Sequence, residues 1–505
     1  MPYPIEKYFK NKLAFLEELK KRDEKYWLDR GKKSAMRLFH VVSERVPAYK
    51  KILKKNKISV KNIRSVADFK KLPLVDKSSY LKSYPLPELC LDGKFSSKSW
   101  VISATSGSTG EPFYFPRTEK QDLQYALTAE MYLLTNFNID KKTTLYVNGF
   151  AMGVWIGGLF TYQAIKHISE KNKYPLSIIN PGTNKVEILK SLKKLAPYFD
   201  QVIIGGYPPF IKDLVDFGAS EGFLWKKHNV KFIFSAEGFS EEFRNYIIKK
   251  VGLKNPLLDT LNHYGTVDLG TMSYETPVSI LVRRLAIGNK KLLKILFGQE
   301  DKLPTLTQYI PEQFYFEELD RMLVCSSAGG LPLVRYDLKD NGGIFTFRDL
   351  LRKAKISGID LLGEINKAGI SHTLWQLPFV YVYERADFSV SFYGANIYPE
   401  TIRKVLMNTK YNRYFTGKCV LEIEMSKNQD QILCIHIEEN NRISTQSVIQ
   451  EDLKNKIFDI LMRENSEFKI IHSSIGSKAV PVIRFWSYEH PIYFKQGGKQ
   501  KWVKK

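Results

Sequence analysis

The spacing of hydrophobic positions changes several times along the chain, and each spacing predicts a different kind of element. Over residues 5–58, apolar residues recur at helical intervals among dense charges, which predicts a helical lead-in. Over residues 176–224, short apolar runs alternate with helical stretches, and a further strand over 231–238 runs into a predicted helix. Repeated strand, glycine turn and helix are typical of a parallel sheet covered on both faces. We therefore expect an α/β fold whose strand-end turns carry the chemistry.

The pattern changes again in the second half of the chain. From residue 313 it predicts short antiparallel strands, then a long connection over 341–384 with helix-like text, and from residue 388 a compact α+β unit. We place the boundary near Asp387. The prediction is a large domain over residues 1–386, with the helical lead-in over 1–95, and a small mobile domain over 387–505.

One apolar stretch, residues 145–160, could be mistaken for a membrane span. It is shorter than the ~20 residues that a spanning helix needs, and it contains Asn148 and four glycines. A buried strand, a turn and the start of a packed helix fit it better.

Composition limits the class of protein without identifying it. The chain has 505 residues, 44% hydrophobic and 26% charged, which is ordinary for a globular enzyme of at least two domains. The net charge of +24 raises the question of a nucleic acid or an anionic membrane. Its lysines are scattered in short runs such as 50–55 and 290–294, which favours solvated helix faces and no specific nucleic acid. Such a field suits small anionic substrates such as ATP.

The cysteines and histidines give little sign of a metal centre. The four cysteines are far apart and form no C-x-x-C pair, and the eight histidines show no ligand spacing, so we expect no structural zinc. Residues 1–12 are charged and lack the apolar region of a signal peptide. These observations favour a reduced, cytoplasmic location.

A glycine-rich stretch, A-T-S-G-S-T-G-E-P-F over residues 104–113, is the strongest local motif. Gly107 and Gly110 permit positive φ, so successive N–H groups could face one anion. Hydroxyls are supplied by Thr105, Ser106, Ser108 and Thr109. The stretch lacks the lysine of a Walker loop. Taken alone, it is either a phosphate cradle or a polar hairpin turn.

Several separated motifs agree with one family. They are T-S-G-S-T-G-E-P, the segment 235–244, Y-G-T-V-D at 264–268, P-L-V-R-Y-D-L-K-D at 332–340, E-R-A-D-F-S-V-S-F-Y-G-A-N-I-Y-P at 384–399 and G-G-K at 497–499. In this order they resemble the phenylacetate-CoA ligase branch of the adenylate-forming superfamily. That superfamily includes acyl-CoA synthetases, nonribosomal adenylation domains and luciferases. The chain also looks like the capsule-biosynthesis adenylate-forming proteins of the same branch, and the matches span residues 43–501.

The resemblance implies an ATP- and Mg²⁺-dependent reaction that forms an acyl-adenylate and releases pyrophosphate. A thiol or an amine then displaces AMP. It assigns the loop from Thr105 to Gly110 to the β- and γ-phosphates. Asp268 falls where the family has a metal-linked glutamate, and a helix cap is the alternative reading of that residue. Asp340 aligns with the aspartate that accepts both ribose hydroxyls, and an Asp-Asn-Gly turn is its alternative.

The resemblance also assigns the adenine slot and a mobile cation. Tyr264 and Gly265, with the backbone of Ala236, Glu237 and Gly238, correspond to the adenine slot, although a tyrosine in such a turn is more often core packing. Arg385 corresponds to a ribose or phosphate contact, or else to a linker ion pair. Lys499 corresponds to the lysine that stabilises the adenylating transition state. Lys501 takes this role if the alignment of the motif shifts. Without the resemblance, this basic tail would be interpreted as a frayed end.

The acceptor and the acid are less defined. Coenzyme A is the expected acceptor, since Gly394 would let a pantetheine arm approach. One alternative is an amide-forming ligase that uses an amine, and another is a non-catalytic basic binding protein on the same fold. The aromatic residues Phe150, Trp155 and Tyr207 are compatible with a flat or aromatic carboxylic acid, and equally with core packing.

Overall fold

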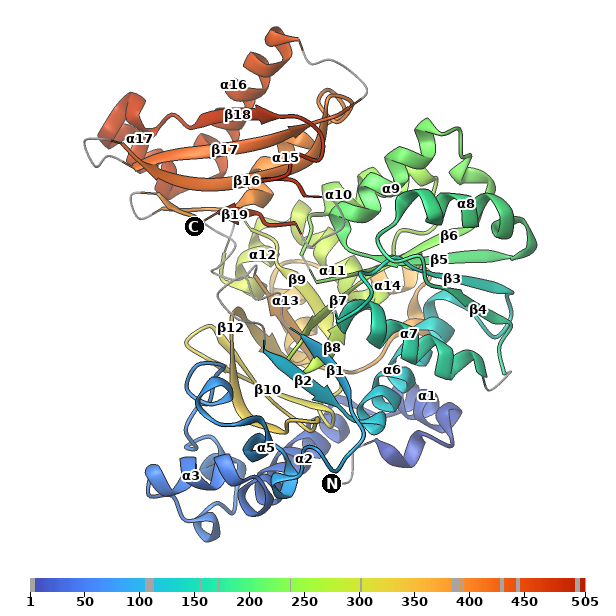
Figure 1. Ribbon diagram of the computed structural model, residues 1–505, viewed down its shortest axis with the longest axis vertical. Helices are drawn as coiled ribbons and strands as arrows, with labels where there is room; N and C mark the ends of the chain where they lie inside the picture. The colour runs from blue at the N-terminus through green and yellow to red at the C-terminus, as the bar shows by residue number, and fades with distance from the viewer. Residues whose placement is uncertain are drawn as a thin grey trace.

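The computed structural model describes residues 5–104, 113–154, 156–170, 173–236, 238–299, 302–383, 390–392, 395–426, 431–441, 446–495 and 500–504. A large domain contains the N-terminal helices and the main sheet, and a smaller domain formed by the C-terminal residues lies beside it (Figure 1). The predicted α/β class with a second α+β unit is confirmed.

The first two helices of the lead-in each begin after a polar residue whose side chain caps the helix. The Asn11 side chain accepts a hydrogen bond from the N–H of Ala14 at 3.2 Å at the start of α1 (Lys12–Lys21). Asp23 accepts one from the N–H of Tyr26 at 2.9 Å at the start of α2 (Glu24–Arg45). Pro47 is the first residue of α3 (Pro47–Lys55), where its missing N–H costs nothing. Two short helices follow, α4 (Val66–Phe69) and α5 (Leu86–Leu89).

An eleven-stranded mixed sheet forms the centre of the large domain, in the order β10-β11-β12-β13-β9-β8-β7-β6-β5-β3-β4. Neighbouring strands from β4 to β7 run parallel, which confirms the predicted parallel sheet, and the remaining pairs are antiparallel. The strands are β3 (Thr144–Asn148), β4 (Leu176–Ile179), β5 (Gln201–Gly206), β6 (Val230–Ser235), β7 (Thr260–Thr266), β8 (Gly270–Tyr274), β9 (Thr305–Gln308), β10 (Phe314–Leu319), β11 (Met322–Ser327), β12 (Leu333–Phe345) and β13 (Phe379–Val382).

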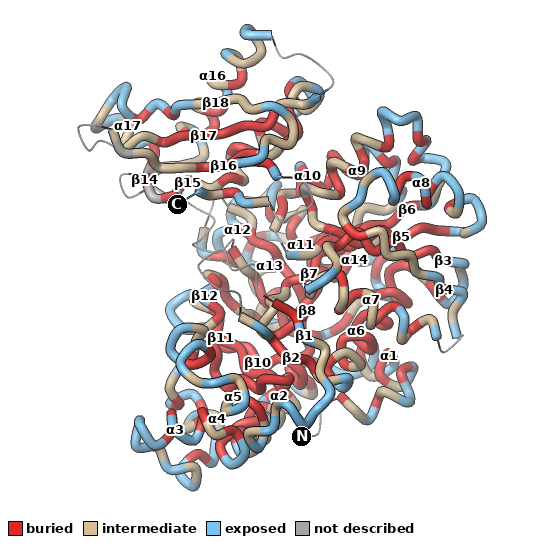
Figure 2. The backbone as a smooth tube through the Cα atoms, in the orientation of Figure 1, coloured by how far each residue is buried: buried red, intermediate tan, exposed pale blue. Residues whose placement is uncertain are grey.

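Helices cover both faces of the parallel strands, and the two-residue period of β5 shows how. Ile203 packs into the core formed with α6 and α7, whereas Val202 and Ile204 pack into the core formed with α8, α9 and α10. The strand is therefore buried on both faces, as Figure 2 shows. The helices of the domain are α6 (Glu119–Phe137), α7 (Ile156–Glu170), α8 (Lys185–Leu195), α9 (Pro208–Ser220), α10 (Glu241–Val251), α11 (Pro277–Gly288), α12 (Lys290–Phe297), α13 (Phe347–Ile356) and α14 (Leu361–Lys367).

The apolar stretch 145–160 forms most of β3, a connection and the start of α7, as expected. No helix among the described residues is both long enough and apolar enough to cross a bilayer.

The glycine-rich stretch joins two antiparallel strands, β1 (Val101–Ala104) and β2 (Tyr114–Arg117), which form a separate two-stranded sheet. The stretch therefore lies between the strands of a hairpin and not after a strand of the main sheet. The hairpin still contacts the main sheet where β3 ends. The N–H of Ala104 donates to the carbonyl of Val154 at 2.9 Å, in the connection between β3 and α7.

The small domain is built on a four-stranded sheet in the order β18-β17-β16-β19, with a further β14–β15 hairpin. Its last strand, β19, pairs in parallel with β16, so the interpretation of the tail as a frayed end is wrong for residues 500–504. The elements are β14 (Val390–Phe392), β15 (Ala395–Ile397), α15 (Pro399–Leu406), β16 (Phe415–Met425), β17 (Gln431–Glu439), α16 (Ser447–Glu464), α17 (Ser466–Ile475), β18 (Val482–Trp486) and β19 (Val503–Lys504).

The two domains are in direct contact along α8, α9 and α10. Lys418 of β16 pairs with Asp213 of α9 at 2.7 Å, and the Glu400 carboxylate accepts from the N–H of Ser240 at 3.1 Å. Met407 packs into the core formed by α8, α9 and α10. The contact places the small domain beside the segment that follows β6.

Candidate active site

Two reciprocal pairs of tyrosine and aspartate join the β7–β8 hairpin to β12. The hydroxyl of Tyr264, on β7, donates to Oδ2 of Asp340 at 2.7 Å, and this pair is buried. The hydroxyl of Tyr336, on β12, donates to Oδ2 of Asp268 at 2.5 Å, and Asp268 lies in the turn between β7 and β8. The structure thus brings together three residues that the sequence assigned to one site, Tyr264, Asp268 and Asp340.

The local structure at both aspartates excludes their alternative interpretations. Asp268 is followed by a strand, β8, so it does not cap a helix. Asp340 and the glycines after it lie within β12, so the Asp-Asn-Gly text does not form a turn. Tyr264 does pack in the core, where its ring stacks on Phe316 with centroids 6.4 Å apart, but its hydroxyl is engaged by Asp340. Its core-packing and site interpretations are therefore compatible.

The helical lead-in supports β12 from outside the sheet. Val75 forms a parallel bridge with Tyr336, and its carbonyl accepts from the N–H of Asp337 at 2.8 Å. Asp76 accepts from the N–H of Ser79 at 2.7 Å and also pairs with Lys339 at 3.0 Å. Burial raises the pKa of Asp76, but hydrogen bonds from Ser79 and Lys339 outweigh it and lower the pKa to about 2. A turn of the lead-in is thus attached to the strand that carries Asp340.

Neighbouring residues of β7 face opposite sides of the sheet. Tyr264 faces Asp340, whereas the ring of His263 lies 5.2 Å from that of Tyr132 and 6.3 Å from that of Tyr125. Burial lowers the pKa of His263 to about 3, so the imidazole is neutral at pH 7. His263 therefore belongs to the core, and Tyr264 to the candidate site.

The segment after β6 contains a residue in an uncommon conformation, and buried arginines contact it further along. Ala236 has φ of 76°, in the left-handed region that non-glycine residues rarely adopt. A few residues later, the carbonyl of Phe239 accepts from Arg283 at 2.6 Å, and the guanidinium of Arg244 lies 4.9 Å from the Phe239 ring. Such strain persists where the surroundings fix the backbone.

Gly265 has no room for a side chain, because a Cβ there would lie 2.5 Å from the carbonyl oxygen of Gly270. This close approach of β7 to β8 sets the position of the hairpin tip that carries Asp268. Gly238 lies in the segment between β6 and α10.

Two of the three aromatic residues considered for the acid pocket, Phe150 and Tyr207, are among the described residues. The rings of Phe150 and Tyr207 meet edge to face with centroids 5.3 Å apart, between the ends of β3 and β5. Gly157 approaches the Tyr207 hydroxyl, where a Cβ would lie 3.2 Å from the oxygen. These residues lie beside the connection from β3 to α7, which contacts β1.

Several predicted site residues lie outside the described residues. They are Thr105, Ser106, Gly107, Ser108, Thr109, Gly110, Trp155, Glu237, Arg385, Gly394 and Lys499. Both strands that flank the glycine-rich stretch are described, and near Lys499 the description ends at Lys495 and resumes at Gln500.

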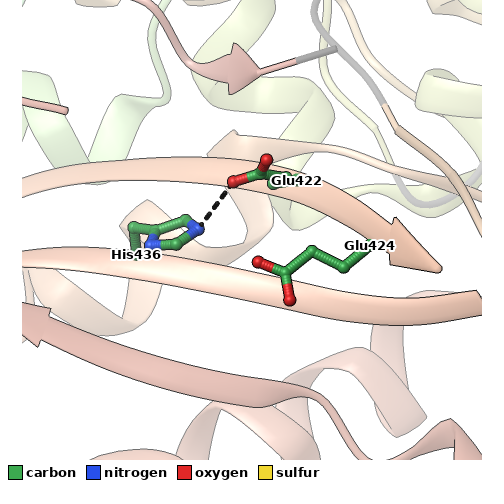
Figure 3. Close-up of side chains that lie close together, drawn as sticks. All are labelled: Glu422, Glu424 and His436. Atoms are coloured by element: carbon green, nitrogen blue, oxygen red, sulfur yellow. Dashed lines mark hydrogen bonds and ion pairs between the residues drawn. The ribbon is translucent and has the colours of Figure 1, made fainter. Parts of the chain in front are cut away.

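Glu422, Glu424 and His436 cluster on the sheet of the small domain (Figure 3). Their ligand atoms lie within 4.8 Å of one another, a spacing that could suit a metal ion. The indole N–H of Trp486 donates to Nδ1 of His436 at 2.9 Å, so Nε2 carries the proton and faces Glu422 at 3.1 Å.

The two carboxylates of this cluster also have cationic partners. Arg484 donates to Glu424 at 2.8 Å, and Lys504 lies 3.0 Å from Glu422. Because the imidazole has its proton on Nε2 and both carboxylates are paired, the donor set fits an ion-pair cluster better than a metal centre.

Sequence reasoning missed the residues that orient the site. Tyr336 stands in the P-L-V-R-Y-D-L-K-D motif at 332–340, four positions before Asp340, and the strand period alone would have placed both on one face. Arg283 had no local signal, because it reaches Phe239 across 44 positions of sequence.

Comparisons with known proteins establish the fold. No family model matches the chain, and no curated protein sequence does. Among solved structures, 2-hydroxyisobutyryl-CoA ligase in its postadenylation state with R3-HIB-AMP overlays with a TM-score of 0.64 at 13% identity, covering 95% of this chain and 89% of that chain. The same ligase in its thioesterification state, with 2-HIB-AMP and CoA, overlays with a TM-score of 0.51 at 14% identity over the same shares. The chain therefore has the fold of adenylate-forming ligases.

Proposed function

We propose that this protein activates a carboxylic acid with ATP and transfers the acyl group to a thiol, with coenzyme A as the acceptor. In the first step, a carboxylate oxygen of the acid attacks the α-phosphorus, and the bond from that phosphorus to the pyrophosphate oxygen breaks. In the second step, the thiol sulfur attacks the acyl carbon and AMP leaves. The observation that carries the proposal is the reciprocal pairing of Tyr264 with Asp340 and of Tyr336 with Asp268.

The nucleotide is assigned to the ends of β6 and β7. Asp340 would accept hydrogen bonds from both ribose hydroxyls, a role that needs an ionised carboxylate of fixed orientation. The Tyr264 hydroxyl supplies the orientation, and its ring, with the backbone of residues 236–238, would form the adenine slot. Arg385 would contact the ribose or a phosphate.

The phosphates are assigned to the glycine-rich stretch and to Asp268. Backbone N–H groups and hydroxyls from Thr105 to Gly110 would bind the β- and γ-phosphates. Asp268 offers a hard oxygen donor, and a neutral hydroxyl orients it, so it fits a Mg²⁺ ion. When bound, Mg²⁺ would neutralise charge on the pyrophosphate leaving group.

Lys499 would stabilise the charge that develops as the acid's carboxylate approaches the α-phosphate. Contacts of the small domain with α9 and α10 support this, because they bring that domain beside the proposed adenine slot. The chain overlays on the postadenylation state of the ligase above with a TM-score of 0.64 and on its thioesterification state with one of 0.51, which supports more than one arrangement of the two domains. A rotation of the small domain between the two steps would follow.

The proposal is tested by isotopic exchange between ATP and pyrophosphate with five acids, phenylacetate, benzoate, 2-aminobenzoate, 2-hydroxyisobutyrate and acetate. We expect exchange that requires Mg²⁺ and is fastest with an aromatic acid, because Phe150 and Tyr207, whose rings contact each other, would form an aromatic wall of the acid pocket. Thioester formation on adding coenzyme A would identify coenzyme A as the acceptor. If an acyl product forms with an amine and without coenzyme A, the acceptor is an amine.

No exchange with any of the five acids, together with no calorimetric binding of ATP, would contradict the proposal. Retention on DNA that falls steeply with salt, without nucleotide turnover, would point to a basic binding protein instead.

A further inference from the structure

A cavity of about 370 Å³ lies between α2 and the β10–β11 edge of the main sheet. One wall is α2, and the other includes Tyr315 of β10 with Ser326 and Ser327 of β11. The volume falls in the range of small-molecule sites, about 300 to 1,000 Å³. Both α2 and β10 lie at the end of the large domain remote from the small domain (Figure 1). The cavity shares no lining residue with the tyrosine–aspartate pairs of the candidate active site.

The two carboxylates that line this cavity already have cationic partners. The guanidinium of Arg30 donates to both carboxylate oxygens of Glu312. Glu6 pairs with Lys120, whose Nζ lies 2.6 Å from Oε1. Neither carboxylate is therefore available to balance a further cation of the cavity.

Three other cations line the cavity, and they have no carboxylate partner among the described residues: Lys7, Lys33 and Arg37. Lys33 and Arg37 are four positions apart on α2, so they are neighbours on one face of the helix, where like charges repel. Burial raises the pKa of Glu312, and the charges of Arg30, Lys7 and Arg37 oppose the rise, so these cations lie within electrostatic reach of one another. The cavity thus has a local surplus of positive charge.

A buried hydroxyl and an apolar surface complete the lining. Ser326 is 2% exposed, and its Oγ accepts from the N–H of Arg335 at 2.8 Å. Because the hydroxyl acts as an acceptor in that bond, its own proton can be donated to a ligand oxygen. Ala35, Leu38 and Ala328 supply the apolar surface. The lining therefore suits a ligand with an anionic group and an organic body.

We propose that this cavity binds a small phosphate monoester, with Lys33 and Arg37 on the phosphate and the organic body against the apolar surface. A phosphate monoester carries about −1.5 to −2 charges at pH 7, which matches several unpaired cations better than a single carboxylate does. A guanidinium also binds two phosphate oxygens at once. Binding at this cavity does not depend on the reaction proposed above.

The cavity and the candidate active site lie on opposite faces of the main sheet. Tyr315 lines the cavity, whereas the ring of Phe316, the next residue of β10, stacks on that of Tyr264 with centroids 6.4 Å apart. Tyr264 is the residue that orients Asp340. A ligand in the cavity would therefore leave the nucleotide site open.

Calorimetric titration of the full-length protein with three monoesters tests the ligand class. They are glucose 6-phosphate, glycerol 3-phosphate and phenyl phosphate, which differ in their organic body, and inorganic phosphate is the comparison. We expect at least one monoester to bind at least about tenfold more tightly than inorganic phosphate, because its body covers the apolar surface. If no monoester binds more tightly than inorganic phosphate, the proposal is wrong.

Two double variants on α2 test the place of binding. Lys33→Gln/Arg37→Gln removes two cations of the cavity, whereas Lys25→Gln/Lys32→Gln removes two exposed cations of the same helix that do not line it. We expect the first to weaken binding of the tightest monoester about 100-fold, since each lost charge-assisted hydrogen bond counts for about tenfold. The second should stay within about threefold of wild type. Equal weakening in both variants would reduce the effect to net charge and overturn the site.

Urea unfolding shows whether the cavity residues serve the fold instead. Without ligand, Lys33→Gln/Arg37→Gln should unfold at the same urea concentration as wild type or at a slightly higher one, because it removes two like charges that repel. With saturating monoester, wild type should become more stable and this variant should not. A variant that is less stable than wild type without ligand would assign both residues to the fold and contradict the proposal.

Competition with ATP separates the cavity from the nucleotide site. We expect saturating ATP to leave the affinity for the monoester within about threefold, because the two sites lie on opposite faces of the sheet. Displacement by ATP, together with wild-type affinity in Lys33→Gln/Arg37→Gln, would place the monoester in the nucleotide site and overturn the inference. If the protein does not bind ATP at all, the proposed function fails, and the comparison of the two double variants still decides whether the cavity is a site.

Discussion

Two clusters of polar side chains flank the ends of β6 and β7, and different donor groups bind their carboxylates. In the first, Arg244 and Arg283 share the carboxylates of Glu241 and Glu275, at 2.7 to 3.2 Å, with side chains that are at most 2% exposed. In the second, Asp340 and Asp268 accept hydrogen bonds from tyrosine hydroxyls. A tyrosine orients a carboxylate without neutralising it, whereas an arginine does both.

The difference distinguishes residues that stabilise the fold from residues of the candidate active site. The arginine cluster fixes the backbone after β6 through the carbonyl of Phe239, and its own charges are matched internally. The tyrosine–aspartate pairs present oriented carboxylates at the junction of β7 and β12. Changes in the first cluster should therefore alter stability, and changes in the second should alter nucleotide binding.

The largest effect is expected from Glu275→Gln, in the arginine cluster. It leaves two buried guanidinium groups short of a counter-charge, which typically costs about 3 to 5 kcal/mol. Urea unfolding followed by tryptophan fluorescence measures the loss. Glu364→Gln serves as the control, because its pair with Lys367 lies 3.7 Å apart with both side chains at least 36% exposed, and such pairs contribute little. Equal losses in the two variants would remove the distinction between scaffold and surface pairs.

A second effect concerns His263, on the core face of the strand that carries Tyr264. Its pKa is lowered from 6.5 to about 3, so below pH 6.5 the unfolded chain binds a proton that the folded protein does not. Stability should therefore fall as the pH drops from 6.5 towards 3, by about 2 kcal/mol at pH 5 from this residue alone. His263→Asn should lose about 2 kcal/mol less between pH 7 and pH 5 than wild type.

Urea titrations of both proteins at the two pH values provide this measurement. An identical pH dependence in wild type and His263→Asn would contradict the assignment of His263 to the dry core.

The smallest of these effects is expected from Asp340→Asn, in the site. Loss of the charge should weaken ATP binding about tenfold, or about 1.4 kcal/mol, while the free energy of unfolding changes by less than about 1 kcal/mol. Asp337→Asn is the matched control, because Asp337 lies on the same strand and its carboxylate pairs with Lys339 at 2.6 Å. Calorimetric titration with ATP should show wild-type affinity for that control. A loss of stability without a loss of affinity in Asp340→Asn would place Asp340 in the scaffold.

Local sequence patterns predicted the elements well, because periodicity is a local property. The parallel strands and the helices between residues 341 and 384 appear where the pattern indicated. A hairpin was one of the two interpretations that the sequence left open for the glycine-rich stretch. Its strands pair with each other, and no local signal distinguishes such a hairpin from a strand that enters the main sheet.

Contacts between distant residues explain most of what the sequence could not predict. Tyr336 and Asp268 are 68 positions apart, and the Glu422–Lys504 contact spans 82. The basic tail looked frayed because its anchors, Trp502 and the pairing of β19, depend on a sheet formed by earlier residues. The motif matches pointed to Lys499, and only the fold shows how its flanks are held.

The central claim is that adenylation uses a cation delivered by the small domain. The most direct test compares Lys499→Ala with Lys501→Ala in ATP–pyrophosphate exchange and in thioester formation from preformed acyl-adenylate. We expect Lys499→Ala to lower exchange at least about 100-fold, with thioester formation within about threefold and Lys501→Ala close to wild type in both. Wild-type exchange in Lys499→Ala, or an equal loss in both half-reactions, would contradict the account.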